Sequence, residues 1–579
     1  MGNNRDKTPN GGRIIILAAV LAVLVGVLAF IIYMQATIID AAPPTVMESS
    51  PQQTAEPTPA PTVEPTPEPT PFDPHWVEST NPENFIKSTS VMVDGEIVTD
   101  YHDDNPISFG ESSEYTAVKG VTTFRGNNFR DSASYGTAKL ESKTFDSDLW
   151  TVATASLTSP DGAVWTGSGW TGQPLIVEWP KELRQHMNMY DWAKQADSLV
   201  EVIYATMDGY IYFIELTGGE YTRAPLYLGY TFKGSGSLDP RGYPILYLGA
   251  GYDSNQGKSH AFIISLIDCS IMYEFGANDA FALRQWPMFD GAPLVDADTD
   301  KLIYPGENGI IYIITLGTQY DEAAGTVSVN PSKVVKWRYT GKRTTTYTYW
   351  LGMEASAIIW QSHLIIPDNG GNLMCLDLNT LTLDWVQDIQ DDSNSTPVLE
   401  LEDGHPYIYV STSFHAGWRA PENGTADVPI WKIDAVTGEI VWSVSYKCHT
   451  VSGVSGGVQG SIAIGKNNLS DLIFVPVART PEGSTGVLVA LDKKTGKEVW
   501  SVDTQMYSWS SPAVVYDENG DGYIIYCTSG FYIYLLDGRT KEKLDSMNIG
   551  GNIEASPAVY ENYVVVGHRA QQIYGIRMK

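Results

Sequence analysis

Cysteine and positive charge are both scarce in this chain of 579 residues. Its four cysteines, Cys269, Cys375, Cys448 and Cys527, are too few and too widely spaced for a disulfide-stapled fold or a four-thiolate metal cluster. Lys and Arg total 37 against 68 Asp and Glu, and a chain with a net charge of −31 repels nucleic-acid phosphates. We therefore expect no nucleic-acid partner and a fold held together by packing.

Metal and nucleophile motifs are also missing from the sequence. The nine His residues are scattered, without HxH or HExxH spacing, so neither a zinc site nor a nucleophile–base pair is predicted. Hydrophobic residues nevertheless make up 43% of the chain, and 53 Gly and 33 Pro indicate many turns. The composition favours a large, turn-rich globular body.

One long apolar run lies near the N-terminus, from Ile14 to Tyr33, and its 20 residues can cross a bilayer as a helix. Arg5, Lys7 and Arg13 precede it, whereas the next basic residue is Lys87. The positive-inside rule therefore predicts a cytoplasmic tail at 1–13, a transmembrane anchor at 14–34 and an extracellular C-terminal domain on a single-pass membrane protein. A cleaved signal peptide is the alternative, although its apolar region is normally shorter.

A Pro-, Thr- and Glu-rich stretch follows the apolar run. Its composition, as in EPTPAPTVEPTPEPTP, cannot bury enough apolar surface to fold and favours extended polyproline II. We predict a disordered linker at 35–80 and a membrane-distal lead-in segment at 81–120.

The remainder of the chain repeats itself. Four clear copies share an Asp, a Thr three residues later and, in three copies, a Trp eight residues after the Asp; they are LDLNTLTLDW (376–385), IDAVTGEIVW (433–442), LDKKTGKEVW (491–500) and LDGRTKEKLD (536–545). The pattern predicts two strands joined by a tight turn. Upstream of each hairpin, a small-residue start such as SSPAVV or EASPAV opens two further strands, and eight such four-stranded units can be found.

Eight units of short strands predict an all-β fold, an eight-bladed β-propeller of four-stranded blades. The last unit ends at Lys579 with only three strands. The segment 147–155 (SDLWTVATA) matches the missing strand, so we predict that an N-terminal strand closes the ring. One helix-forming insertion, at 180–198, is expected between the first two strands of the first blade.

A candidate calcium loop lies at Asp517, Asn519 and Asp521. These residues match the first half of a D-x-[DN]-x-[DN]-G loop, whose alternating oxygens converge on a hard cation. Thr528 stands where the bidentate Glu would be, and an ordinary polar turn explains the residues equally well.

These hairpins, the SPAV strand starts and the opening TFRGNNFRDSASYG from Thr123 resemble the quinoprotein-like, or pyrroloquinoline quinone (PQQ)-binding-like, β-propeller repeat family, which includes BamB-like scaffolds. The resemblance covers about 121–579. It implies that the repeated tryptophans dock between neighbouring blades, here Trp150, Trp337, Trp385, Trp442 and Trp500.

Two functions follow from this resemblance. The first, which we favour, is a non-catalytic binding or scaffold module for envelope protein or cell-wall glycan. Aromatics near Trp165, Trp170, Trp418 and Trp431 are consistent with either ligand, and blade packing is the alternative role for these residues. The alternative is a PQQ- and calcium-dependent dehydrogenase-like enzyme. Because the chain lacks the adjacent cysteine pair of those dehydrogenases, we expect neither PQQ nor catalysis.

Overall fold

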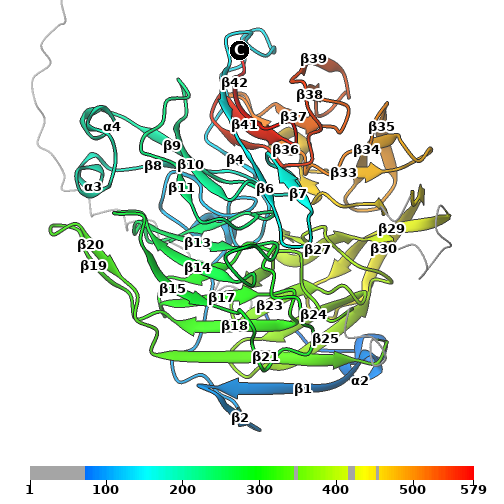
Figure 1. Ribbon diagram of the computed structural model, residues 1–579. Coiled ribbons are helices and arrows are strands. Elements are labelled where there is room, and N and C mark those ends of the chain that lie inside the picture. The colour runs from blue at the N-terminus through cyan, green and yellow to red at the C-terminus, as the bar shows by residue number, and fades with distance from the viewer. Residues whose placement is uncertain (1–71, 344–349, 415–423, 452–454) are drawn as a thin grey trace, which may run out of the picture. The chain divides into compact units, whose positions relative to one another are not determined.

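The computed structural model describes residues 72–343, 350–414, 424–451 and 455–579. Within them, eight sheets of four or more strands follow one another along the chain. Figure 1 shows these sheets arranged around a common centre, which confirms the predicted all-β, eight-bladed propeller. The predicted tail at 1–13, the anchor at 14–34 and the linker up to residue 71 lie outside the described residues. In the part that is described, no helix is long and apolar enough to cross a membrane.

Blades 1 to 4 follow one another along the chain, each beginning with its inner strand. Blade 1 contains β8 (Leu175–Glu178), β9 (Val200–Ala205), β10 (Tyr210–Glu215) and β11 (Leu226–Tyr227), with β3 (Gly120–Val121) beside β8. Blade 2 contains β12 (Ser237–Leu238), β13 (Ile245–Gly249), β14 (Ala261–Ser265) and β15 (Ile271–Phe275). Blade 3 contains β16 (Leu294–Asp296), β17 (Lys301–Pro305), β18 (Ile310–Thr315) and β21 (Lys333–Gly341). Blade 4 contains β22 (Ile358–Trp360), β23 (His363–Pro367), β24 (Asn372–Asp377) and β25 (Thr382–Asp388).

Blades 5 to 8 continue the ring. Blade 5 contains β26 (Val398–Glu402), β27 (His405–Ser411), β29 (Thr425–Asp434) and β30 (Ile440–His449). Blade 6 contains β28 (Ser413–Phe414), β31 (Gly456–Gly457), β32 (Ala463–Ile464), β33 (Leu472–Ala478), β34 (Gly486–Asp492) and β35 (Glu498–Thr504). Blade 7 contains β36 (Ala513–Tyr516), β37 (Gly522–Cys527), β38 (Tyr532–Asp537) and β39 (Lys543–Asn548). Blade 8 contains β40 (Ala558–Tyr560), β41 (Tyr563–His568), β42 (Gln572–Arg577) and β5 (Trp150–Ala153), with β4 (Ser134–Tyr135) beside β40.

The remaining elements are short. Two hairpins stand outside the blades, β6 (Ser156–Thr158) with β7 (Val164–Thr166) and β19 (Gln319–Asp321) with β20 (Thr326–Ser328). The helical turns are η1 (Glu78–Thr80), α2 (Pro82–Phe85), η2 (Ser112–Glu114), α3 (Lys181–His186), α4 (Asp191–Gln195) and η4 (Asn467–Leu469).

The ring closes through the N-terminal strand, as predicted. β5 pairs antiparallel with β42, placing Trp150 opposite Gly575 and Val152 opposite Ile573. Val152 and Ile573 are buried in a cluster shared by blades 8 and 1. The last blade is therefore built from both ends of the described chain, which leaves no open edge at the seam.

Residues before the first blade also belong to the propeller body. In the predicted lead-in segment, β1 (Ile86–Val93) pairs with β21 and β2 (Glu96–Val98) pairs with β1, which extends blade 3 to six strands. Within the range 35–80 predicted as linker, Phe72 stacks on Trp360 at 4.7 Å between ring centroids. Thr80 Oγ1 donates to the carbonyl of Thr437 at 2.7 Å, so this short stretch lies on blades 4 and 5.

The insertion between β8 and β9 contains two short helices rather than one. Both lie within the predicted 180–198, but the chain leaves helical geometry after α3. Met187 and Met189 are buried there in the cluster shared by blades 1 and 2, and Asn188 N–H donates to the carbonyl of Ile267 at 2.6 Å. Burial of the two methionines ties the middle of the insertion to blade 2 and separates the helices.

Tryptophans dock one blade on the next in a repeated way. Four indole N–H groups donate to the carbonyl that follows the Asp or Glu of the neighbouring hairpin: Trp150 to Leu216 at 2.7 Å, Trp385 to Ala435 at 2.9 Å, Trp442 to Lys493 at 2.8 Å and Trp500 to Gly538 at 3.2 Å. The hairpin glycine packs on the ring, and a Cβ added to Gly438 would lie 2.7 Å from the Trp385 indole. The Gly of the repeat is therefore needed both for its φ of +72° and for the contact.

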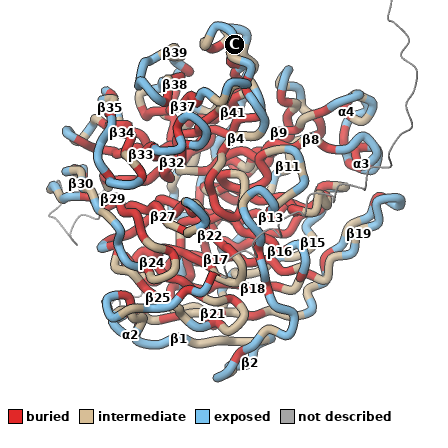
Figure 2. Tube along the Cα trace, turned by 180° about the vertical axis from the view of Figure 1, so that it is seen from behind, coloured by how far each residue is buried: buried red, intermediate tan, exposed pale blue. Residues whose placement is uncertain are grey.

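Trp337 differs from the other four. It is fully buried between blades 3 and 4, but its indole nitrogen has no hydrogen-bond partner among the described residues. The neighbouring hairpin carries Leu381 at the position that Gly219, Gly438 and Gly496 occupy in three other hairpins, and Leu381 adopts a φ of +57° in the same cluster. Figure 2 shows the resulting pattern for the whole ring, with buried residues towards the centre and exposed ones at the outer turns.

Candidate functional site

At six of the eight junctions between blades, the start of the inner strand is linked to the next blade by a side-chain hydroxyl, and we call this set the hydroxyl ring. A backbone N–H at the strand start donates to a Ser or Thr oxygen at the equivalent position of the next blade: Gln173 to Ser235, Ala292 to Ser356, Ser356 to Thr396, Thr396 to Ser461, Ser461 to Ser511 and Ser511 to Ser556, at 2.7–3.1 Å. Ser556 N–H then donates to the carbonyl of Gly172 at 2.9 Å, back on blade 1. This hydroxyl ring explains the small-Ser-Pro motif as a requirement of blade-to-blade packing.

A second set of equivalent positions lies two residues before the hydroxyl ring. We call these the entrance positions: Thr171, Lys233, Asp290, Glu354, Asn394, Gln459, Trp509 and Glu554. The residue that follows each is small; a Cβ on Gly234 would lie 1.8 Å from the carbonyl oxygen of Asp290 in the next blade. Unlike the hydroxyl ring, the entrance positions are chemically varied. Packing does not require such variety, but recognition of an asymmetric ligand does.

On the other side of the hydroxyl ring, the chain folds back through the centre. We call residues 120–134 the axial segment, and it contacts the inner part of every blade. In blade 1, β3 pairs with β8, and in blade 6, Lys466 forms an ion pair with Asp131. Backbone and side-chain hydrogen bonds connect the segment to blades 2, 3, 4, 5, 7 and 8. Its contact residues on β12, β22, β26 and β40 each lie five residues after an entrance position. The axial segment therefore forms a floor beneath the hydroxyl ring.

Two fully buried arginines hold this floor in place. Arg130 donates to the carbonyls of Ala357, Ala292 and Phe124 at 2.9–3.0 Å and to Thr123 Oγ1 at 2.7 Å. Arg125 donates to the carbonyls of Arg130 and Pro512 at 3.1 Å. Burial lowers the pKa of both guanidinium groups to about 10, so they remain charged at neutral pH and are satisfied by oxygen dipoles.

A pocket of about 430 Å³ opens at the entrance positions. It is lined by side chains from blades 1 to 7: Trp165, Trp170, Thr171, Lys233, Tyr252, Trp286, Glu307, Glu354, Asp392, Asn394, Ser455, Gln459 and Trp509. We call it the axial pocket. Its aromatic rings follow one another in a row, with centroids 4.9 Å apart for Tyr252 and Trp165, 6.4 Å for Trp165 and Trp170, and 6.2 Å for Trp170 and Trp509.

Two of these tryptophans are positioned by features outside the blade pattern. Trp165 lies on β7 of the β6–β7 hairpin, whose turn is fixed by a 2.7 Å hydrogen bond from Tyr252 OH to Asp161. Trp170 has a φ of +54°, a conformation that a bulky residue rarely adopts, and its N–H donates to Glu554 Oε2 at 3.3 Å. Strain of this kind persists where surrounding contacts hold a functional geometry.

Charged groups form the polar wall of the axial pocket. Lys233 Nζ lies 3.3 Å from Asp290 Oδ2 and 4.8 Å from the ring centre of Trp170, a cation–π contact. Arg284 Nη2 lies 3.9 Å from Glu307 Oε2 and 4.0 Å from Glu354 Oε1. Burial, and then the carboxylates of Glu354 and Asp290, raise the pKa of Glu307 well above its usual range.

The side-chain amide of Asn369 connects acidic groups of the polar wall. Asn369 Nδ2 donates to Glu354 Oε1 at 3.1 Å and to Asp392 Oδ1 at 2.7 Å, while Asn369 Oδ1 accepts from Arg284 at 2.5 Å. One polar network therefore runs across blades 3, 4 and 5 beside the aromatic row.

A second cavity of about 590 Å³ adjoins the axial pocket. The two share Tyr252 and Trp286 as lining residues, and the second is also lined by Asp161, Asp253 and Lys258. A ligand longer than the axial pocket can therefore continue past this aromatic pair.

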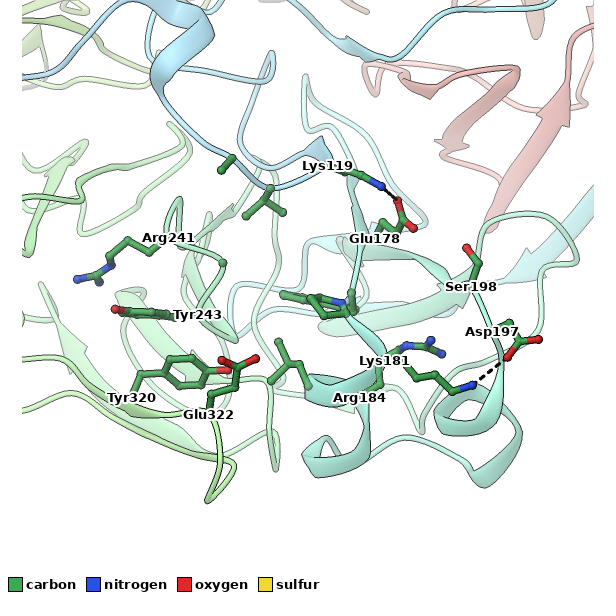
Figure 3. A pocket seen from close by; sticks show the side chains of 16 residues that line it. Lys119, Glu178, Lys181, Arg184, Asp197, Ser198, Arg241, Tyr243, Tyr320 and Glu322 are labelled. Atoms are coloured by element: carbon green, nitrogen blue, oxygen red, sulfur yellow. Dashed lines mark hydrogen bonds and ion pairs between the residues drawn. The ribbon is translucent and has the colours of Figure 1, made fainter.

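A third hollow, of about 530 Å³, lies away from the axis between blades 1 and 2 and the helical insertion. Figure 3 shows its ion pairs, Lys119 with Glu178 at 3.1 Å and Lys181 with Asp197 at 2.9 Å. Tyr243 and Tyr320 lie at its opposite side, with ring centroids 4.6 Å apart and ring planes tilted by 39°. Because these lysines are already paired within the groove, the axial pocket is the stronger candidate for a binding site.

The site residues expected from the sequence are placed differently from one another. Trp165 and Trp170 line the axial pocket, Trp431 is buried in the core, and Trp418 lies outside the described residues. The entrance positions were not recognised from the sequence. The sequence does contain a signal for them, because each entrance position lies two residues before the repeated small-residue strand start.

The calcium loop residues form a tight turn before β37. Asp517 Oδ1 accepts from the N–H groups of Asn519 and Asp521 at 2.9 and 3.0 Å, and Asn468 donates to Asp521 at 2.9 Å. Over the described ranges, no group of three or more His, Cys, Asp or Glu side chains has the arrangement of a metal site. Calcium at this loop stays a prediction.

The axial pocket is a poor match for PQQ, the cofactor that the fold family suggests. Lys233, Arg284 and Arg569 contribute positive charge around it, against the carboxyl groups of Asp290, Glu307, Glu354, Asp392 and Glu554. A quinone that carries three carboxylates would be placed beside the carboxyl groups of Glu354 and Asp392, which disfavours its binding. Adjacent cysteines are also absent from the sequence.

Comparison with known proteins supports the fold. Residues 335–506 match the family model described as outer membrane protein assembly factor BamB. A quinohemoprotein alcohol dehydrogenase from Pseudomonas putida is 10% identical, with a TM-score of 0.51 over 82% of this chain and 83% of its own. BamB from Moraxella catarrhalis is 14% identical, with a TM-score of 0.42 over 66% of this chain and 92% of its own. No curated protein matches the sequence.

The evidence for a family is then threefold. The hairpin repeats, the closed ring of eight blades and the family match over 335–506 agree with one another. The structural likeness to the dehydrogenase is a likeness of fold. On these grounds the chain has the fold of the PQQ-like β-propeller repeat proteins, and its residues 335–506 match a family model of that kind.

Proposed function

We propose that this protein is a membrane-anchored, extracellular binding module that holds a cell-envelope glycan in the axial pocket. The observation that carries this proposal is the row of aromatic side chains formed by Tyr252, Trp165, Trp170 and Trp509. All four are partly exposed rather than packed in a core. Aromatic faces bury the apolar faces of sugar rings, and the polar groups beside them bind sugar hydroxyls.

The hydrogen-bonding groups of the axial pocket support a ligand rich in hydroxyls. Trp509 Nε1 is buried without a hydrogen-bond partner among the described residues, so it is an N–H donor available to a ligand oxygen. Asn394 and Gln459 offer both donors and acceptors and bond to each other at 2.9 Å. A sugar hydroxyl can both donate and accept, which suits this mixture.

The location follows from the sequence rather than from the described residues. The apolar run at 14–33, followed by the Pro-rich stretch, would tether the propeller to the membrane at a distance from the lipid. An envelope glycan would be in reach of the axial pocket in that position. The family match to BamB supports a binding role by analogy only.

Tryptophan fluorescence of the full-length chain in detergent micelles tests the proposal. Hexamers of glucose, of N-acetylglucosamine and of glucosamine serve as probes. We expect at least one to change the emission saturably, with the change lost in Trp170→Ala and kept in Trp192→Ala, an exposed position on α4. If no hexamer binds, or if Trp192→Ala is as damaging as Trp170→Ala, the glycan proposal fails.

A further inference from the structure

We propose that the second cavity is a further subsite of the axial pocket, and that the ligand is one linear oligosaccharide long enough to occupy both. This inference rests on the proposed function, because it specifies the ligand of the same site. It depends on the residues that the two cavities share, on the hairpin that contributes to both, and on the chemistry of the second cavity.

Two aromatic side chains belong to both cavities. Tyr252 and Trp286 line each of them, and neither is buried: Trp286 is 40% exposed and Tyr252 is partly exposed. Tyr252 is also the first ring of the aromatic row, with its centroid 4.9 Å from that of Trp165. A sugar unit beside Tyr252 would therefore contact the axial pocket and the second cavity at once.

The β6–β7 hairpin also contributes to both cavities. Trp165 on β7 lines the axial pocket, whereas Asp161 in the turn lines the second cavity. The two strands form a sheet of their own outside the blades, and such a ribbon is marginally stable by itself. Side chains of the loop in blade 2 hold it: Tyr252 OH donates to Asp161 Oδ2 at 2.7 Å, and Asn255 Nδ2 donates to the carbonyl of Thr158 at 3.2 Å. The propeller ring closes through β5 without this hairpin, so we interpret the hairpin as an insertion that shapes one continuous site.

The second cavity has the chemistry of a sugar site. Pro160 and Met288 add apolar surface beside the two shared aromatic rings. Gln285 and Lys258 are exposed and supply hydrogen-bond donors, and Lys258 Nζ is paired with Asp253 Oδ2 at 2.5 Å. Sugar rings bind where apolar faces lie beside a few polar groups. The second cavity therefore offers the same kind of surface as the axial pocket.

The dimensions of the site favour a chain of several sugars. Successive rings of the aromatic row, from Tyr252 to Trp509, have centroids 4.9–6.4 Å apart, a step comparable with the length of one sugar unit. The row therefore has room for a short oligosaccharide. The second cavity, at about 590 Å³ against about 430 Å³, is the larger of the two. A disaccharide would leave much of this site empty, so a longer chain should gain from the additional contacts.

Isothermal titration calorimetry on the full-length chain in detergent micelles tests this inference. The probes are the dimers and hexamers of glucose, N-acetylglucosamine and glucosamine. We expect a hexamer to bind at one per protein and about tenfold or more tightly than its dimer, because the added sugars contact a further aromatic wall.

Three tryptophan variants locate the source of this gain. Trp286→Ala should bring the ratio of hexamer to dimer affinity close to one, whereas Trp170→Ala should weaken dimer and hexamer alike. Trp192→Ala is the matched control, because Trp192 is 38% exposed against 40% for Trp286 and lies on α4, away from both cavities. It should leave the ratio as it is in the unmodified protein.

The outcomes separate this inference from the proposed function. If dimer and hexamer bind equally tightly, or if Trp286→Ala weakens both by the same factor, the inference is overturned and glycan binding stands. If two hexamers bind per protein, the cavities are independent sites, and the inference is again overturned. If no hexamer binds, the proposed function itself fails.

Discussion

At the scale of single residues, the docking tryptophans differ in one hydrogen bond. Trp385 and Trp337 are both fully buried between blades, but only the Trp385 N–H reaches a carbonyl, that of Ala435. Substitution by Phe removes similar volume from each site. Trp385→Phe also leaves a buried carbonyl without its donor, which costs about 1–3 kcal/mol.

We therefore expect Trp385→Phe to lower the free energy of unfolding by about 1–3 kcal/mol more than Trp337→Phe. Urea denaturation monitored by circular dichroism measures both variants, provided that the m-values agree. Equal losses would show that ring packing alone, and not the N–H bond, docks the blades.

Asp384 makes stability depend on pH. Burial, and then repulsion from Asp377, raises its pKa to about 8, and its Oδ2 lies 3.6 Å from Nε2 of His363, whose own pKa burial lowers. The folded protein therefore binds a proton at Asp384 that the unfolded chain releases near pH 4. This contribution to stability is complete below pH 4 and is lost as the pH rises through about 8.

We expect the free energy of unfolding to fall between pH 5 and pH 9, by at most about 1.4 kcal/mol per pH unit from this group, and the Tm to fall with it. Asp384→Asn, which resembles the protonated carboxyl, should flatten that slope in scanning calorimetry. Asp503→Asn, at an exposed site, should retain it. An unchanged slope in Asp384→Asn would remove Asp384 as the cause.

Individual site residues were harder to predict than the docking tryptophans. A Trp at a fixed place in a hairpin repeat can be recognised by aligning the repeats, whereas the entrance positions hold a different residue in almost every blade. Repetition reveals the residues that the fold requires. It hides those that vary from blade to blade, such as Lys233 and Glu354, until the structure brings the blades together.

At the scale of elements, β5 is the strand on which closure of the ring depends. Val152 on β5 is buried between blades 8 and 1, whereas its neighbour Thr151 points outward. We expect Val152→Asp to lower the Tm sharply, since burying an unpaired carboxylate costs several kcal/mol, and Thr151→Asp to change it little. Calorimetry on the two variants decides this. Similar Tm values for both would mean that β5 is not an integral part of blade 8.

Elements with a strong local pattern were predicted well, and those defined by distant contacts were not. The hairpins and the closing strand follow from alternation and from the missing fourth strand of the last unit. The addition of β1 and β2 to blade 3 has no local signal, because their partner β21 lies some 240 residues away in sequence. The helical insertion was located correctly, but its division depends on the burial of Met187 and Met189.

At the scale of the whole molecule, Arg130 joins the axial segment to blades 3 and 4. Lys in its place keeps the charge but has three donors where the guanidinium has five, and it cannot reach both blades in the same plane. We expect Arg130→Lys to lower the free energy of unfolding by about 3 kcal/mol, as buried carbonyls lose their donors. Arg577→Lys, at an exposed position, is the control for urea denaturation. A loss below 1 kcal/mol would contradict a central role for Arg130.

The axial segment also has a consequence for the order in which the protein folds. Residues 120–134 are made early by the ribosome, yet their partners reach as far as Val559, and β5 must await β42 near the C-terminus. The early segment is enclosed by blades that do not yet exist when it is synthesised. Contacts between such distant residues are formed late and slowly. Release of the axial segment likewise requires the ring to open, so the folded protein should unfold slowly even where its equilibrium stability is modest.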